Sequence, residues 1–89
     1  MRILYSRTAR RFLEQQTDEA YHDIRGIVVL LSTDPAVDGA NKVLMPYLPV
    51  FLPCFKGSRW WIAYQVDGTG DDEALLVLAI APAGKRPSL

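Results

Sequence analysis

The side chains best suited to chemistry in this chain are basic, and they occur in three groups along the sequence. The groups are Arg2, Arg7, Arg10 and Arg11 near the start, Lys56 and Arg59 in the second half, and Lys85 and Arg86 near the end. Fixed cations can hold a phosphate group or stabilise the negative charge that develops during phosphoryl transfer. Ten basic and ten acidic residues give a net charge of zero, so a basic face forms only if these groups converge in the fold. The alternative is an ordinary surface of mixed charge.

The remaining chemical groups are weaker candidates. His22, the sole histidine, stands among acidic residues on a predicted polar helix face. Cys54 lies between Pro53 and Phe55, which favours a buried, inert thiol over a nucleophile. The acidic stretch that begins at Asp67 does not fit a calcium-binding loop. Asp72 stands at the sixth position, where such a loop needs glycine, and Leu78 stands at the twelfth, where it needs a closing glutamate. We therefore predict neither a metal site nor a bound cofactor.

Two adjacent tryptophans, Trp60 and Trp61, are candidates for packing and for partner binding. Successive side chains of a strand point to opposite faces, so we expect one indole in the core and the other partly exposed. An exposed tryptophan can anchor a partner chain or stack on a nucleic-acid base. We predict that Trp61, together with Arg7 and Arg11, contacts a partner protein. A solvated helix face is the alternative for the two arginines.

Length and composition restrict the class of protein. The chain has 89 residues, which we expect to form one domain over residues 1–89 with a single thin core. Its 49% apolar and 22% charged residues are typical of a globular chain rather than a disordered one. A single cysteine cannot form an internal disulfide, which fits a reducing cytoplasm. The longest apolar run, Ala74–Ala81, is too short to span a bilayer, so we expect a cytoplasmic protein without a membrane partner.

The candidate residues must be positioned by short strands and helices. The predicted elements are a strand at 2–5, a helix opened by Ser6 or Thr8, a helix opened by Thr17 and ended by Pro35, and strands at 59–66 and 75–81. The segment Val43–Phe55 contains three prolines, which lack the N–H that a ladder needs, so we predict one edge or irregular strand there. Two amphipathic helices must bury their apolar stripes against one sheet face. The predicted fold class is therefore α+β, a small antiparallel sheet with an N-terminal helical pair packed on one face, in the order β-α-α-β-β-β.

Four stretches that cover nearly the whole chain carry a resemblance to a known family. They are Ile3–Leu13, a strand followed by a capped helix; Ile27–Pro35, a helix closing on Asp-Pro; Phe55–Val66; and Leu75–Arg86, a strand with a basic tail. These stretches resemble the RelE/ParE superfamily of bacterial toxins from type II toxin–antitoxin systems. The most specific is Phe55–Val66, which is similar to the family's Gly–aromatic–Arg–x–x–Tyr strand. The resemblance implies a growth-arresting toxin with a cognate antitoxin as its partner.

The RelE branch of this family implies one activity for the chain. Toxins of that branch cleave messenger RNA in the decoding site of the ribosome and so inhibit translation. Basic residues stabilise charge, without a metal, while a ribose 2′-hydroxyl attacks the adjacent phosphate. The resemblance therefore implies an endoribonuclease in which Arg59, Lys56, Lys85 and Arg86 stabilise charge, with the ribosome and mRNA as further partners.

Departures from the family pattern leave a second activity open. Trp61 stands where the family's strand arginine is expected, and Leu52 and Cys54 stand where lysines are usual. The ParE branch targets gyrase and has no established nuclease site, so the alternative is a non-enzymatic or degraded toxin that acts by binding a protein. Lysine and arginine stay protonated near neutral pH unless strongly perturbed, so none of the four candidate cations is a convenient general base.

Overall fold

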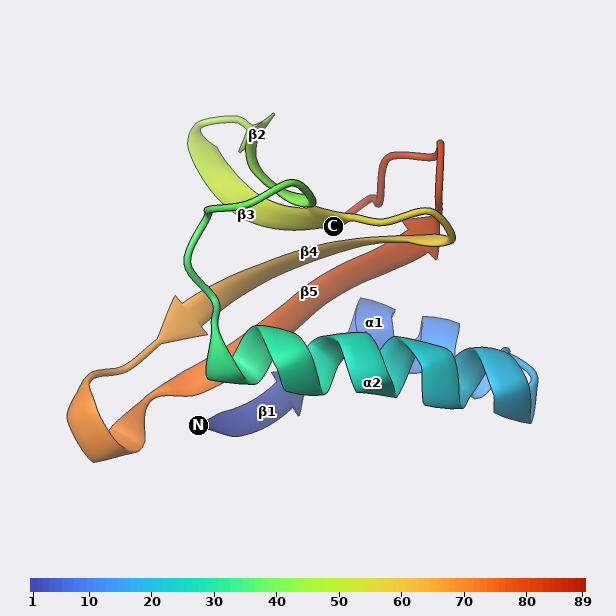
Figure 1. The fold of residues 1–89 in the computed structure, drawn as a ribbon, viewed down its shortest axis with the longest axis horizontal. Coiled ribbons are helices and arrows are strands. Elements are labelled where there is room, and N and C mark those ends of the chain that lie inside the picture. The colour runs from blue at the N-terminus through green and yellow to red at the C-terminus, as the bar shows by residue number, and fades with distance from the viewer.

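Two α-helices lie on a five-stranded sheet in the computed structural model, which describes residues 1–89 (Figure 1). In chain order the elements are β1 (Arg2–Tyr5), α1 (Arg7–Glu14), α2 (Asp18–Thr33), β2 (Lys42–Tyr47), β3 (Val50–Lys56), β4 (Trp60–Asp67), a 3₁₀ turn at Gly70–Asp72, and β5 (Ala74–Pro82). The strand order across the sheet is β1-β5-β4-β3-β2. Neither helix has the length and apolar character needed to cross a membrane. The predicted α+β class and the N-terminal helical pair are confirmed.

Side-chain caps fix where both helices begin. The Ser6 hydroxyl accepts a hydrogen bond from the Ala9 N–H at 3.0 Å, and Thr17 caps α2 in the same way at 3.2 Å. Of the two residues that could open the first helix, Ser6 is therefore the cap and Thr8 is not. The Ser6 hydroxyl also donates to the Leu78 carbonyl at 2.6 Å. This second bond ties the start of α1 to β5.

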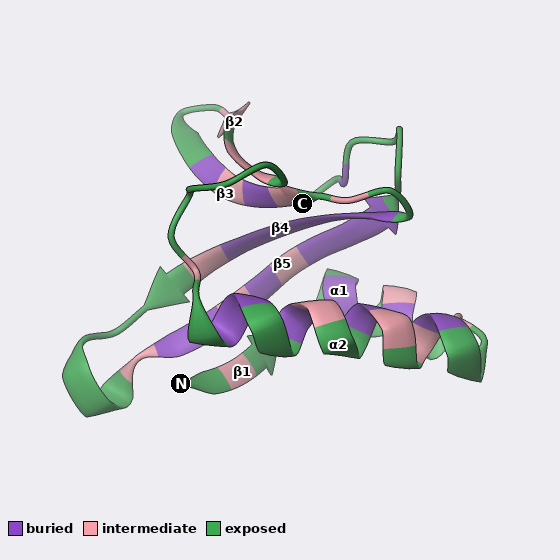
Figure 2. Ribbon diagram, in the orientation of Figure 1, coloured by how far each residue is buried: buried purple, intermediate pink, exposed green.

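The main core lies between the helical pair and the sheet, and Figure 2 shows it as the buried residues of α2, β4 and β5. Its buried members are Ala9, Leu13, Ala20, Ile24, Val28, Leu31, Trp60, Ile62, Tyr64, Leu75, Val77 and Ile80. Tyr64 is fully buried, and its hydroxyl donates to the Pro35 carbonyl at 2.8 Å. This bond joins β4 to the segment that follows α2.

The proline-rich segment 43–55 forms two strands rather than the single strand that we predicted. β2 and β3 pair as an antiparallel hairpin that turns at Leu48 and Pro49, whose peptide bond is cis. β2 lies at the edge of the sheet, where a proline is tolerated. Pro53 precedes the residues through which β3 pairs with β4, namely Cys54–Lys56. Prolines in this segment therefore leave the sheet intact, because they stand at its edge or outside the β3–β4 pairing.

The sheet is mixed rather than wholly antiparallel. β1 pairs in parallel with β5, and the other three pairings are antiparallel. Parallel neighbours need a long connection, and here both helices and three strands lie between β1 and β5. The expectation of an antiparallel sheet therefore fails at this one edge.

A second, smaller cluster covers the sheet face opposite the helices. Its buried members are Cys54, Trp61, Ala63 and Ala79, with Val43, Met45 and Tyr47 packed around them. Trp60 and Trp61 point to opposite faces, as alternation predicts, yet both are buried, at 8% and 9% exposure. The expected partial exposure of one indole is wrong, because side chains of the β2–β3 hairpin, Lys56 among them, pack against Trp61.

Candidate functional site

Five residues on the sheet face opposite the helices form the candidate site, and we call them the basic–aromatic cluster: Tyr47, Cys54, Lys56, Trp61 and Arg86. Nζ of Lys56 lies 4.4 Å from the centroid of the Trp61 ring, and Cζ of Arg86 lies 4.2 Å from the centroid of the Tyr47 ring. Both distances are within the range of cation–π interactions. Aromatic side chains therefore hold two of the predicted cations on this face.

Strand pairing and the C-terminal tail assemble the cluster. Lys56 stands opposite Trp61 in the β3–β4 register, so their side chains share one face of the sheet. Arg86 comes from the tail that follows β5, and Figure 1 shows this tail turning back toward β3. The Tyr47 hydroxyl donates to the Pro87 carbonyl at 2.8 Å, and Pro87 itself is buried. The tail is thus folded onto the sheet face rather than free.

The basic–aromatic cluster has a net positive charge. Burial raises the pKa of the Cys54 thiol, although the Trp61 side chain and the charges of Arg86 and Lys56 act in the opposite direction. Burial also raises the pKa of the Tyr47 hydroxyl, so both groups are neutral near neutral pH. Neither Lys56 nor Arg86 takes part in a salt bridge. Their charges are therefore available to an anion such as a phosphate or a carboxylate.

The chemistry of the cluster suits charge stabilisation better than proton transfer. Nε1 of Trp61 is buried without a hydrogen-bond partner, which leaves one unpaired donor close to the cations. No carboxylate or imidazole belongs to the cluster, and His22 lies against Tyr21 within α2, with ring centroids 5.6 Å apart. The arrangement can bind and stabilise an anion, but it offers no evident general base.

Arg59 lies on the helix side of the sheet and not in the cluster. Its Nη1 is 3.1 Å from Oδ2 of Asp23 in α2, and the Trp60 indole N–H donates to the same oxygen at 2.7 Å. The predicted strand at 59–66 would place Arg59 on the same face as Trp61, but Arg59 precedes the first residue of β4, so strand alternation does not constrain it. Its acidic partner therefore comes from α2 and not from a loop of the sheet.

The other predicted cations are exposed and dispersed. Lys85 neighbours Arg86 in the tail and is exposed. Arg7 and Arg11 are exposed on α1, which packs on the opposite side of the sheet from the cluster. Of the three basic groups in the sequence, the structure therefore brings together only Lys56 and the tail.

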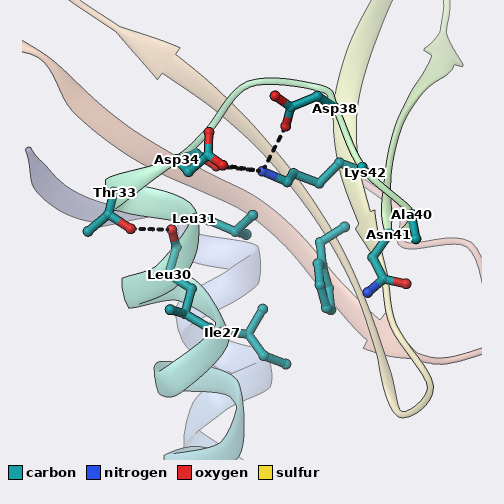
Figure 3. A pocket seen from close by; sticks show the side chains of 11 residues that line it. Ile27, Leu30, Leu31, Thr33, Asp34, Asp38, Ala40, Asn41 and Lys42 are labelled. Atoms are coloured by element: carbon teal, nitrogen blue, oxygen red, sulfur yellow. Dashed lines mark hydrogen bonds and ion pairs between the residues drawn. The ribbon is translucent and has the colours of Figure 1, made fainter.

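A groove on the helix side is a feature that the sequence reasoning missed, and we call it the α2–β3 groove. Its main cavity, of about 440 Å³, is lined by Ile27, Leu30, Leu31, Thr33, Asp34, Asp38, Gly39, Ala40, Asn41, Lys42 and Phe55 (Figure 3). Nζ of Lys42 donates to the Asp34 carbonyl at 2.7 Å and lies 3.4 and 3.5 Å from carboxylate oxygens of Asp34 and Asp38. The apolar residues of 43–55 were the signal for this groove in the sequence. The single strand predicted there did not indicate a groove, because the groove needs the position of the segment relative to α2.

Comparison with known proteins identifies the fold. No protein-family model matches the sequence, and no curated protein matches it. A solved structure of a YoeB/ParE toxin from Agrobacterium tumefaciens is similar to the chain, with a TM-score of 0.69. The chain has a RelE/ParE-like toxin fold. The similarity covers 86% of this chain and 92% of that chain at 17% sequence identity, so the RelE/ParE-like architecture persists although few residues are shared.

Proposed function

We propose that this chain is the toxin component of a type II toxin–antitoxin system and that a cognate antitoxin keeps it inactive in the cytoplasm. One observation carries the proposal: a RelE/ParE-like fold presents two cations without acidic partners, Lys56 and Arg86, on the sheet face opposite the helices. A fixed pair of cations on a sheet is suited to a target that carries negative charge.

The first candidate target is messenger RNA on the ribosome. Lys56 and Arg86 would hold the phosphate between two nucleotides and stabilise its charge while the neighbouring 2′-hydroxyl attacks and the 5′-oxygen leaves. Lys85 adds positive charge beside Arg86. Arg59 would join them only by leaving Asp23, so in this mechanism we assign it a smaller part than the other three.

A second candidate, a protein target such as gyrase, is favoured by what the cluster contains. Removal of the 2′-hydroxyl proton calls for a base, and the pKa values of Tyr47 and Cys54 are both raised. Neither group is therefore a base near neutral pH. Binding an acidic surface of a protein needs no base. Such binding is the ParE-like alternative.

Cell-free translation with the purified protein separates the two candidates. An RNA-cleaving toxin cuts the messenger only when ribosomes are present. In that case Lys56→Ala/Arg86→Ala lowers the cutting rate by at least about 100-fold, whereas Arg7→Ala/Arg11→Ala, which removes two charges from α1, cuts like the wild type. An intact messenger together with inhibited supercoiling by gyrase supports the protein target. Unchanged messenger, translation and supercoiling contradict both candidates.

A further inference from the structure

Residues 87–89 lie against the basic–aromatic cluster, and we call them the C-terminal strap (Figure 1). They belong to no helix or strand, and no backbone–backbone hydrogen bond involves them. Their attachment consists of the buried Pro87 and the bond that the Tyr47 hydroxyl donates to its carbonyl at 2.8 Å. Ser88 and Leu89 are exposed, and Leu89 borders a cavity of about 460 Å³ beside the β2–β3 hairpin. A segment held by one hydrogen bond opens at a low cost in free energy.

Hydrogen-bond donors and positive charges gather at the point where the strap is attached. Nε1 of Trp61 is buried without a hydrogen-bond partner, and Trp61 as a whole is 9% exposed. Burial raises the pKa of the Cys54 thiol, and the Trp61 and Tyr47 side chains, which both reach this sulfur, act in the opposite direction. Lys56 and Arg86 lie over the rings of these two aromatic residues. Two donors and two cations thus lie around the attachment point.

The strap uses only a small part of this binding capacity. Its Pro87 carbonyl is a neutral acceptor that takes the single proton of the Tyr47 hydroxyl. The Trp61 N–H donates to no atom of the strap, and neither cation of the cluster forms a salt bridge. An anionic oxygen forms shorter and stronger hydrogen bonds with such groups than a neutral carbonyl does. An anion can therefore compete with the strap for this position.

We propose that the C-terminal strap is an internal competitor at the basic–aromatic cluster, and that a phosphate group displaces it to accept hydrogen bonds from the Tyr47 hydroxyl and the Trp61 N–H. The closed and the bound states exclude each other, because both use the one Tyr47 proton. Arg86 precedes the strap, so it stays on the Tyr47 ring when residues 87–89 move away. A phosphate offers more acceptor oxygens than a carboxylate, so it engages more of the donors. The inference deepens the proposed function, because it adds two binding residues to the same site.

A phosphate titration read on the two tryptophan indoles of the chain tests the inference. Inorganic phosphate is added to the ¹⁵N-labelled protein at constant ionic strength, and both indole N–H signals are followed by NMR. The Trp61 signal should shift. The Trp60 signal should not, because its N–H donates to Asp23 on the other side of the sheet. Acetate is the comparison ion and should bind at least about threefold more weakly than phosphate.

Pro87→Gly measures how strongly the strap competes. The variant loses the buried ring and gives the released strap more conformational freedom, so its affinity for phosphate should rise at least about threefold. Pro87 belongs to no helix or strand, and we expect the variant to keep the fold. Ser88→Gly is the matched control, because it adds backbone freedom to the strap at an exposed residue. Its affinity should stay within about twofold of the wild type.

Tyr47→Phe tests the attachment of the strap without any ligand. Loss of the hydroxyl should make the Trp61 indole hydrogen exchange with solvent at least about threefold faster relative to the Trp60 hydrogen. Tyr64→Phe is the matched control, since the Tyr64 hydroxyl makes a bond of the same length, 2.8 Å, to the Pro35 carbonyl on the helix side. This variant should leave the ratio of the two exchange rates unchanged.

The results separate the inference from the proposed function. Phosphate affinity of Pro87→Gly that equals or falls below that of the wild type overturns the strap as a competitor. A Trp61 signal that ignores phosphate, or acetate that binds as tightly, overturns the phosphate site. An unchanged exchange ratio in Tyr47→Phe overturns the attachment. All three results leave the toxin function standing, because the cell-free translation assay tests that function separately.

Discussion

Asp23 determines where the candidate cation Arg59 lies. Its Oδ2 accepts the Trp60 indole N–H at 2.7 Å and lies 3.1 Å from the Arg59 guanidinium. One carboxylate thus satisfies a buried donor and holds an exposed cation, which keeps Arg59 away from Lys56. Arg59 therefore does not join the basic–aromatic cluster, and neither do Arg7 and Arg11 of α1.

Asp23→Ala should lower the free energy of unfolding by about 1 to 2 kcal/mol, because it leaves the buried Trp60 N–H without an acceptor. The Arg59 side chain is 56% exposed, so solvent screens its pair with Asp23 and the pair contributes little of this change. Urea denaturation followed by tryptophan fluorescence measures the loss. Asp38→Ala is the control, because it removes one carboxylate beside Lys42 and leaves Asp34 paired with the same ammonium group. Equal destabilisation by the two variants would contradict the role of Asp23.

Tyr64 should make the folded protein lose stability at alkaline pH. Burial raises the pKa of its hydroxyl from 10.0 to about 12, whereas in the unfolded chain the group ionises at its ordinary value. Its contribution is therefore fully present below pH 10 and declines as the pH rises toward 12. Unfolding free energies measured across this range should fall less steeply for Tyr64→Phe than for the wild type. Some decline remains in Tyr64→Phe, because burial also raises the pKa of Tyr5 and Tyr47. Parallel curves of unfolding free energy against pH for the two proteins would refute the role of Tyr64.

At the residue scale, the opposite directions of Trp60 and Trp61 were predictable from the sequence, and the burial of Trp61 was not. Alternation along β4 correctly placed Trp60 and Trp61 on opposite faces. The burial of Trp61 depends on side chains of the β2–β3 hairpin and on Lys56, which come from other strands. Trp61 therefore loses its predicted role as an exposed anchor for a partner. It remains in the site as the aromatic surface beneath Lys56.

The elements with caps and helical periodicity are the ones that local sequence determines most directly. Ser6 and Thr17 begin the two helices, and α2 ends just before Asp34-Pro35, as predicted. The hairpin in 43–55 was not predictable in the same way, because its turn at Leu48 and Pro49 contains no glycine or asparagine. Without that signal, three prolines indicate one irregular strand rather than two paired strands.

Ser6→Ala should lower the free energy of unfolding by about 1 to 2 kcal/mol, because the hydroxyl both caps α1 and bonds to the Leu78 carbonyl of β5. Thr8→Ala is the matched control, since Thr8 could have capped the helix but is exposed within it. Its effect should be below about 0.5 kcal/mol. Thermal unfolding followed by circular dichroism measures both variants. A greater loss from Thr8→Ala would show that the cap is wrongly assigned.

At the scale of the whole molecule, the sheet separates two surfaces of different chemistry. The helix side has an apolar groove with an acidic end, and the opposite side has the basic–aromatic cluster under the folded tail. The order of elements was enough to predict an α+β fold with a helical pair on one face of the sheet, and the resemblance to the RelE/ParE superfamily added the toxin fold. The groove was not predictable, because it depends on β1 pairing beside β5 and leaving β2 and β3 beyond the helices.

Growth of bacterial cells that express this chain alone tests the central claim, that it is a toxin, most directly. We expect induction of the wild-type protein to arrest growth. Lys56→Ala/Arg86→Ala, expressed at the same level, should relieve the arrest, and Arg7→Ala/Arg11→Ala should not, because its charges lie on the other side of the sheet. Normal growth with folded wild-type protein present, or equal arrest by the two double variants, would contradict the account.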